Sequence, residues 1–309
     1  MRRNIKLSLA VVAAVTLVTS AANAAVVYNN NFDGTGSSTV LASTVGSQPL
    51  GFTMVSPTTG NVGGTSNPLA AGDFGAVVVN SSSTHVTNLA GTGNGLRVYD
   101  AASASGSPRE VALRSTVFSG STLAVSMNFA SNALTSTSGS NFLNITFGSN
   151  NHNPDAWNEA QFRLAIARNS GTTSTLQATN GNTIDVTPLA GGSTLAFPLQ
   201  TSNLLKVFLN QSASSVNYLE GVTSRTLAAR TYDVWLNGTL LTSTTSFGMV
   251  SGTGLVTTLG LGTGGGQTGA DWVFDNIMVE NVLPIPEPTS ILGLLVIGST
   301  LVLRRRSAI

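Results

Sequence analysis

The sequence predicts an all-β protein, an antiparallel β-sandwich, between an N-terminal signal helix and a short C-terminal transmembrane helix. Short apolar segments alternate with polar residues and are separated by Gly, Ser, Thr and Asn, which is typical of strands joined by turns. Charged residues make up only 9% of the chain, and its interior shows no sustained period of 3.6 residues. Each end combines an apolar run with basic residues, as export and membrane segments do.

The first 24 residues have the layout of a secretory signal peptide. A basic start, Met1 to Lys6, precedes an apolar core from Leu7 to Val18, and the small residues Ala22 and Ala24 stand at cleavage spacing. We therefore expect the secretion translocon and signal peptidase to act on the chain, and the mature protein to begin at Ala25. The alternative is an uncleaved N-terminal anchor, for which an apolar core of about a dozen residues is short.

The exported body, residues 25–283, is long enough for one large β domain. It has eight basic and twelve acidic residues, so nucleic acid is not an expected partner. The chain has no cysteine, which excludes disulfides, a thiol nucleophile and a lipidated cysteine.

Strands are predicted wherever apolar residues recur at every second position. Asn237-Gly238 is a strong signal for a two-residue hairpin turn. A run of about a dozen short strands without helices implies two antiparallel sheets packed face to face. The predicted strands lie at 26–28, 76–79, 96–99, 111–113, 123–129, 143–147, 162–166, 205–209, 232–236, 240–241, 259–262 and 272–279.

The last strands resemble those that close concanavalin A-like (laminin G-type) jelly rolls. The resemblance is carried by Tyr232 to Gly238, Leu259 to Gly262 and Trp272 to Val279, with Phe32-Asp33-Gly34 near the start. It implies a jelly roll in which the Phe-Asp-Asn-Ile strand ends the domain and the opening strand lies beside it.

Catalytic motifs are absent from the body, so we expect no enzyme activity. His85 and His152 lack the spacing of a transition-metal site. Gly-x-Ser-x-Gly does not occur, nor does the Glu-x-Asp-x-x-Glu strand of retaining glycosidases with this fold. The alternative is a surface glycan-degrading enzyme of the concanavalin A-like class whose motifs differ.

One loop has the composition of a sugar-binding edge. Trp157 could stack on a sugar ring, while Asn153 and Asp155 bond hydroxyl groups. The alternative is a solvated loop with Trp157 packed against the sheet. No cofactor is expected, except that Asp33 and Asp275 could hold a structural Ca²⁺ if the first and last strands adjoin. Alternatively, both are turn-forming residues that bond nearby backbone N–H groups.

The C-terminal residues 284–309 form the third part of the chain. Pro284, Pro286 and Pro288 keep the segment before the apolar run extended. The run at 289–303 predicts a helix of roughly 22 Å, marginal against a hydrocarbon core of ~30 Å. The basic cluster Arg304, Arg305 and Arg306 would stay in the cytoplasm.

Together, Pro286-Glu287-Pro288, the short apolar helix and the arginine cluster resemble the PEP-CTERM sorting signal of Gram-negative bacteria, with Ile285 replacing the usual valine. The resemblance implies processing by an exosortase-type enzyme and a transient stay in the inner membrane. The protein would then reach the cell surface or extracellular matrix, with a structural or adhesive role and possible contact with polysaccharide. The alternative is a permanent membrane anchor.

Overall fold

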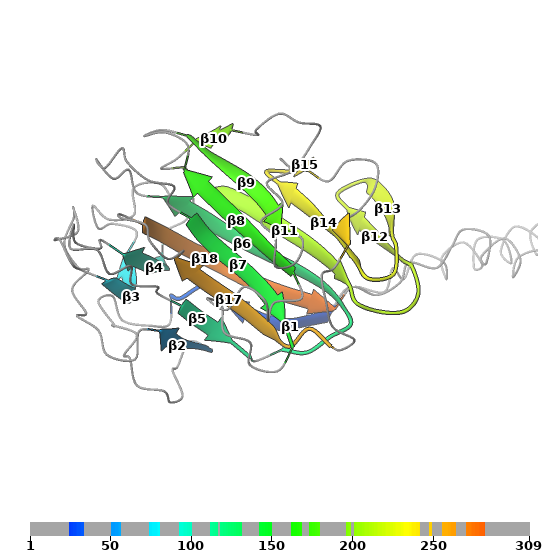
Figure 1. The fold of residues 1–309 in the computed structure, drawn as a ribbon, viewed down its shortest axis with the longest axis horizontal. Coiled ribbons are helices and arrows are strands. Elements are labelled where there is room, and N and C mark those ends of the chain that lie inside the picture. The colour runs from blue at the N-terminus through cyan, green and yellow to red at the C-terminus, as the bar shows by residue number, and fades with distance from the viewer. Residues whose placement is uncertain are drawn as a thin grey trace, which may run out of the picture.

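The computed structural model gives two antiparallel sheets packed face to face (Figure 1). The description that follows covers residues 25–33, 51–56, 74–80, 93–100, 112–116, 118–131, 142–149, 162–168, 173–179, 196–198, 201–241, 247–248, 255–263 and 270–281.

The larger sheet has nine strands, and each strand pairs with its neighbour in antiparallel direction. Strand β1 (Ala25–Asn30) lies against β18, and the short β16 (Phe247–Gly248) lies against β14. The other strands follow in the order β15 (Thr239–Leu240), β14 (Thr231–Leu236), β11 (Asn203–Asn210), β6 (Thr122–Ser131), β18 (Ala270–Asn281), β4 (Asn94–Asp100) and β3 (Phe74–Asn80).

The smaller sheet has seven strands, and a separate hairpin completes the described elements. The hairpin consists of β12 (Val216–Glu220) and β13 (Thr223–Leu227). The seven-stranded sheet follows the order β10 (Ala196–Pro198), β9 (Thr173–Thr179), β8 (Phe162–Arg168), β7 (Phe142–Gly148), β17 (Thr258–Thr263), β5 (Ala112–Ser115) and β2 (Phe52–Ser56).

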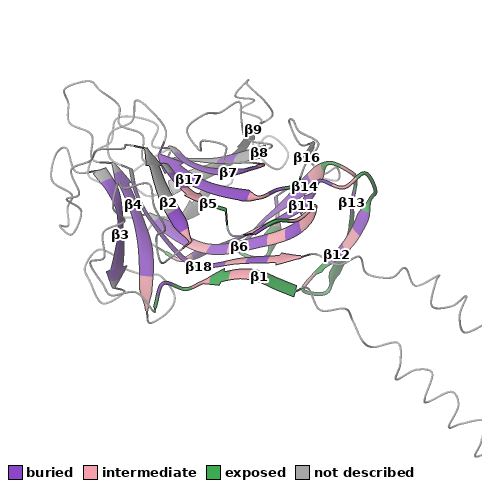
Figure 2. Cartoon of the chain, turned by 90° about the horizontal axis from the view of Figure 1, so that it is seen from below, coloured by how far each residue is buried: buried purple, intermediate pink, exposed green. Residues whose placement is uncertain are grey.

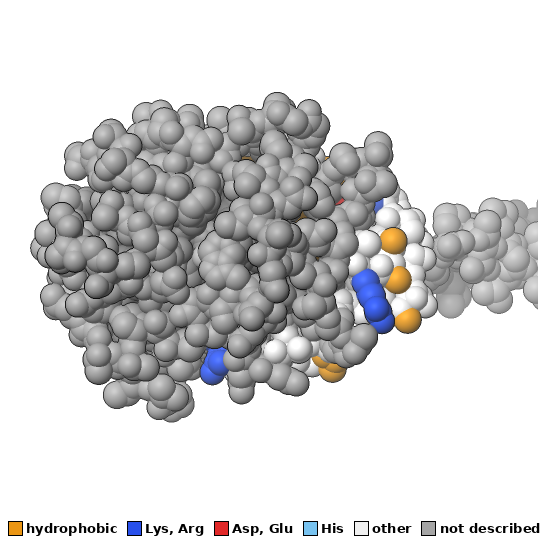
Figure 3. Space-filling view, in the orientation of Figure 1, with side chains coloured by type: hydrophobic (Ala, Val, Ile, Leu, Met, Phe, Trp, Pro, Cys, Tyr) orange, Lys and Arg blue, Asp and Glu red, His pale blue; other side chains and the backbone are white. Residues whose placement is uncertain are grey.

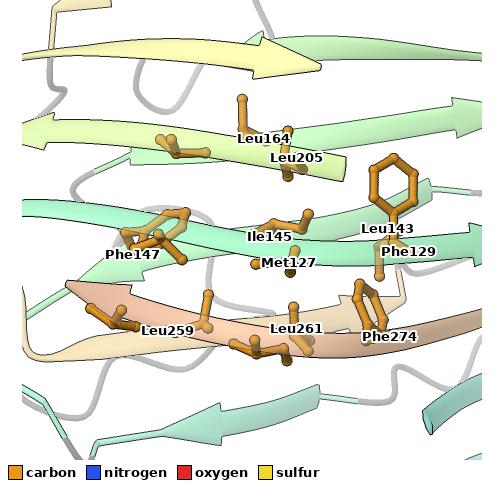
Figure 4. Close-up of a cluster of buried hydrophobic side chains, with 14 of the residues drawn as sticks. Met127, Phe129, Leu143, Ile145, Phe147, Leu164, Leu205, Leu259, Leu261 and Phe274 are labelled. Atoms are coloured by element: carbon orange, nitrogen blue, oxygen red, sulfur yellow. The ribbon is translucent and has the colours of Figure 1, made fainter. Parts of the chain in front are cut away.

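The core lies between the two sheets, because every second residue of the facing strands points inward. Figure 2 shows buried residues along both layers. In Figure 4, Met127, Phe129 and Phe274 from the nine-stranded sheet meet Ile145 and other apolar residues of the seven-stranded sheet. The alternation read from the sequence is thus the alternation between core and outer face.

The predicted all-β sandwich is confirmed. Asn237 and Gly238 both have positive φ, 50° and 77°, and connect β14 to β15 as the Asn-Gly signal predicted. No helix in the described ranges is long and apolar enough to cross a membrane. The signal helix and the C-terminal helix fall at 1–24 and 284–309, outside those ranges.

The first and last strands adjoin. Ala25 is paired with Asn281 and Asn30 with Ile277, so β1 runs antiparallel along the end of β18. This pairing joins residues that are about 250 positions apart in the sequence. The start and the end of the described body therefore lie at the same place in the molecule.

Candidate functional site

Most residues singled out in the sequence lie outside the described ranges. Ala25 is the exception among the export residues, since it begins β1. Those outside are the signal residues Ala22 and Ala24, the loop residues Asn153, Asp155 and Trp157, the sorting motif Pro286, Glu287 and Pro288, and the basic cluster Arg304, Arg305 and Arg306. Residues 150–161 lie in the sequence between the paired strands β7 and β8.

Asp33 follows the end of β1 in a tight turn. Asn30 Oδ1 accepts a hydrogen bond from the Phe32 N–H at 2.8 Å, and Phe32 has a φ of 58° with its ring in the core. Asp33 Oδ1 accepts the Asn94 N–H at 2.8 Å, while Oδ2 accepts Asn31 Nδ2 at 2.8 Å. The carboxylate therefore fastens the β1 turn to the start of β4.

Gly93 leaves the space that Asp33 needs. A Cβ at position 93 would lie 2.1 Å from Asp33 Oδ1, much closer than real Cβ contacts allow. Any larger residue at 93 would displace the carboxylate and its bond to Asn94.

Asp275 is placed by a bulge in β18. The register of β18 against β6 shifts between Asp275 and Met278, and Asn276 within the bulge has a φ of 51°. The Asp275 side chain accepts hydrogen bonds from the Asn276 N–H at 2.7 Å and from Asn276 Nδ2 at 3.2 Å. Asp275 is 8% exposed.

Electrostatics show that the two carboxylates interact. Burial raises the pKa of Asp275 to about 6, the Asn276 N–H lowers it, and the negative charge of Asp33 raises it further. We call this arrangement the clasp, made of Asn31, Asp33, Gly93, Asp275 and Asn276. Asp33 lies in the first turn of the body and Asp275 in its last strand.

The first and last strands adjoin, which was the condition for a Ca²⁺ site at the clasp. Asp275 bonds the N–H of the next residue, as the turn-forming alternative expects, whereas Asp33 bonds the Asn94 N–H, 61 residues away in the sequence. A carboxylate has about four acceptor positions, so oxygen lone pairs remain. Two carboxylates with amide and carbonyl oxygens suit Ca²⁺, which takes six to eight oxygen ligands. The described residues contain no group of three or more His, Cys, Asp or Glu that could hold a metal.

A polar strip borders the clasp on the outer face of the nine-stranded sheet. Asn128 is paired with Asp275, and in the next outward-facing row Ser126 lies between Lys206 and Met278. Apart from the buried Asp275, these residues and Glu280 are half-buried, and they present amide, hydroxyl, thioether and charged groups. We define the polar strip as Ser126, Asn128, Lys206, Met278 and Glu280.

The β12–β13 hairpin covers the sheet beside the strip. Tyr218 stacks on Phe208 with ring centroids 4.0 Å apart, and Trp235 belongs to the same apolar cluster. Tyr218 O–H donates to Asp233 Oδ2 at 2.6 Å, and Trp235 Nε1 donates to Tyr218 OH at 3.0 Å. Figure 3 shows hydrophobic and basic side chains together on the side of the molecule where Figure 1 places this hairpin.

Two cations at the hairpin, Lys206 and Arg225, are each paired with a carboxylate. Lys206 Nζ contacts Glu220 Oε1 at 2.7 Å, and Arg225 Nε contacts Asp233 Oδ2 at 2.9 Å. Both carboxylates are therefore engaged by a cation.

Comparison with known proteins gives a likeness in fold only. No protein-family model matches the chain, and no curated protein matches it. Among solved structures, it is similar to a carbohydrate esterase from the Shiga toxin-encoding bacteriophage phi24B, with TM-score 0.47, 12% identity and coverage of 84% of this chain and 100% of that one. The cellulose-induced protein Cip1 is similar with TM-score 0.44 and 14% identity, over 82% of this chain and 96% of that one. The Emp47p carbohydrate recognition domain is similar with TM-score 0.40 and 10% identity, over 86% of this chain and 100% of that one. Likeness at this level says nothing of what this chain binds.

Sequence reasoning found Asp33 and Asp275 but missed the rest of the clasp and the strip. Asn276 stands in the Phe-Asp-Asn-Ile segment, and an Asn next to a buried Asp is a signal for a bulge or turn. No pattern in the sequence indicates the polar strip, because Asn128, Lys206 and Met278 come together only through the register of three strands.

Proposed function

We propose that the chain is an exported protein that ends at the cell surface or in an extracellular matrix, where its sandwich has a structural or adhesive role. Residues 1–24 direct export, and residues 284–309 hold the protein in the inner membrane until an exosortase-type enzyme removes them. One observation carries this proposal: Ala25, the expected first mature residue, is paired with Asn281, near the expected sorting segment.

This pairing matches the order of processing. Strand β1 begins directly after the expected signal cleavage position, and β18 ends three residues before Pro284. Both membrane-directed segments therefore leave from one end of the sandwich. The body would not have to rotate when its attachment to the membrane changes from the N-terminal segment to the C-terminal segment. Its opposite end would stay available for other contacts.

Contact with polysaccharide is the best specific role for the body. The polar strip offers hydroxyl and amide groups that can bond sugar hydroxyls, and the loop with Asn153, Asp155 and Trp157 adds an aromatic ring. The competing function is hydrolysis of a surface glycan. A clustered pair of carboxylates in a concave groove would favour hydrolysis, whereas a flat face of Asn, Thr and Ser would favour binding.

Sorting is tested by following Glu287→Ala and wild type in a host that has an exosortase. Wild type should reach the surface without its C-terminal helix, while Glu287→Ala should remain uncut in the inner membrane. The processing enzyme would recognise the carboxylate, whereas a plain anchor needs only apolar length and flanking charge. Equal display of both proteins would support the permanent anchor.

Glycan contact is tested with the mature secreted protein on an array of bacterial polysaccharides. Asn128→Ala and Trp157→Ala should each weaken binding, whereas Asn217→Ala, an outward-facing amide on β12, serves as the matched control. Absence of binding by wild type removes the glycan role. Glu159 is a second carboxylate close to Asp155 and Trp157 in the sequence. Release of reducing sugar that disappears in Glu159→Gln would instead establish the hydrolase.

A further inference from the structure

We propose that the end of the sandwich at which Ala25 and Asn281 lie rests on an anionic lipid surface while the C-terminal segment is inserted. We call it the exit end. The contact depends on the proposed function, because it requires that segment to enter a membrane. The contact defines which surface of the body meets the lipid and for how long.

The exit end is built from the ends of several strands. Asn281 is paired with Ala25 and with Leu123, while Asn210 is paired with Thr122 and Thr231. The seven-stranded sheet joins this end through the bridge between Gly120 and Val256. A Cβ at Gly120 would lie 3.0 Å from Asn281 Oδ1, so this bridge lies directly beside the end of β18.

Exposed apolar side chains flank Asn281 on both sheets. Val26, paired with Glu280, is 53% exposed, and Leu255, next to the bridging Val256, is 51% exposed. Arg230 precedes β14 at the same end and is exposed, which suits anionic headgroups. Glu280, the acidic neighbour of Val26, is half-buried.

The length of chain between the body and the apolar run keeps this end close to the lipid. Residues 282–288 are seven residues, which span at most about 25 Å when fully extended. The prolines at 284, 286 and 288 make this segment stiff as well as short. The exit end must therefore face the surface into which residues 289–303 insert.

Two aliphatic side chains bind lipid only weakly, so attachment supplies the local concentration that maintains the contact. Removal of the C-terminal helix would end the attachment and release the body. The contact is therefore expected in the uncut precursor and not in the mature protein.

The absence of cysteine makes a direct test possible. Val26→Cys and Leu255→Cys, each in the precursor 25–309, are labelled with an environment-sensitive fluorophore. Leu219→Cys and Val222→Cys are the matched controls, because these aliphatic residues are 53% and 98% exposed at the tip of the β12–β13 hairpin. The precursor is incorporated into vesicles of equal parts phosphatidylcholine and phosphatidylglycerol with a nitroxide on the headgroup.

Labels at 26 and 255 should be quenched several-fold more than labels at 219 and 222, and the difference should vanish in protein 25–283 mixed with the same vesicles. Equal quenching in precursor that floats with the vesicles overturns the contact and leaves the sorting proposal intact. Precursor that does not float overturns both, because the C-terminal segment then does not insert.

Discussion

At the scale of single residues, Asp275 is the most unusual side chain described. Its carboxyl group is almost fully buried, its two hydrogen bonds both come from Asn276, and its nearest charged influence is another carboxylate, Asp33. An acid in this environment favours its neutral form unless a cation joins it. We therefore expect the clasp to respond to pH, and to divalent ions if it binds them.

The pH dependence follows from the raised pKa. Folding raises the pKa of Asp275 from 3.8 to about 6, so the folded chain binds more protons than the unfolded chain between these values. The contribution of Asp275 to the free energy of unfolding therefore falls as pH rises from about 4 to about 6, by on the order of 1 kcal/mol after allowance for solvent screening.

Asp275→Asn should remove this pH-dependent contribution to the free energy of unfolding. The variant should therefore be more stable than wild type at pH 7 without divalent ions. Urea unfolding at several pH values measures the change, with Glu280→Gln as the control on the same strand. A variant that is less stable than wild type at pH 7, with an unchanged pH profile, would show that the charge of Asp275 is needed for folding.

If the clasp holds Ca²⁺, the bound ion should offset the destabilisation that the charge of Asp275 causes near pH 7. A bound cation stabilises both carboxylates, so millimolar Ca²⁺ should raise the thermal midpoint of wild type, and EDTA should return it to the starting value. Asp275→Asn and Asp33→Asn should lose the response. A midpoint that Ca²⁺ leaves unchanged in wild type would assign both residues to turn formation alone.

At the scale of elements, the pairing of β4 with β18 buries an ion pair on the outer face of the nine-stranded sheet. Arg97 Nε and Nη2 contact Asp271 Oδ1 and Oδ2 at 2.7 Å and 2.6 Å, and both side chains are almost completely buried. Arg97 also lies 5.4 Å from the centre of the Tyr99 ring. The guanidinium of Arg97 and the carboxylate of Asp271 therefore form a bidentate ion pair.

Breaking this pair should be costly because one charge would remain buried alone. Asp271→Asn should lower the free energy of unfolding by about 3–5 kcal/mol, whereas the double variant Arg97→Met, Asp271→Leu should lose much less. Glu220→Gln breaks the partly exposed pair with Lys206 and should cost less than about 1 kcal/mol. Urea midpoints measure all three, and an Asp271→Asn as mild as Glu220→Gln would contradict the expectation.

Elements with a regular alternation were predictable, and those without it were not. Apolar residues alternate along the strands around Val125, Ile145 and Val207, and this alternation marks the residues that face the core. Burial itself alternates residue by residue only around Val125, because Asn144, Thr146 and Asn210 on the outer face are buried as well. Strands β9 and β13 are rich in Thr and Ser, and β13 has one buried residue, Leu227. Their pairing depends on neighbouring strands and not on a pattern of their own.

The site was predictable only in part, for a related reason. A resemblance in the first and last strands brought Asp33 and Asp275 together, and their proximity is confirmed through the pairing of β1 with β18. Arg97 and Asp271 are 174 residues apart, and nothing in either local segment indicates the other. The polar strip likewise exists only once three strands are in register.

At the scale of the whole molecule, the sandwich brings its own ends together. The pairing of Ala25 with Asn281 places the start and the end of the described body together, and under the proposed sorting this end would face the membrane while the polar strip would stay available for other contacts. Under the proposed export, β1 would complete the sheet only after β18 had crossed the membrane. Export, folding and attachment would then be linked in one arrangement of strands.

The intact mass of the mature protein from a host that has an exosortase tests this account most directly. We predict a chain that begins at Ala25 and lacks residues 289–309, because both membrane-directed segments are removed after they have placed the body across the membrane. A mature protein that begins at Met1, or one that retains residues 289–309, would contradict the account and identify the termini as permanent anchors.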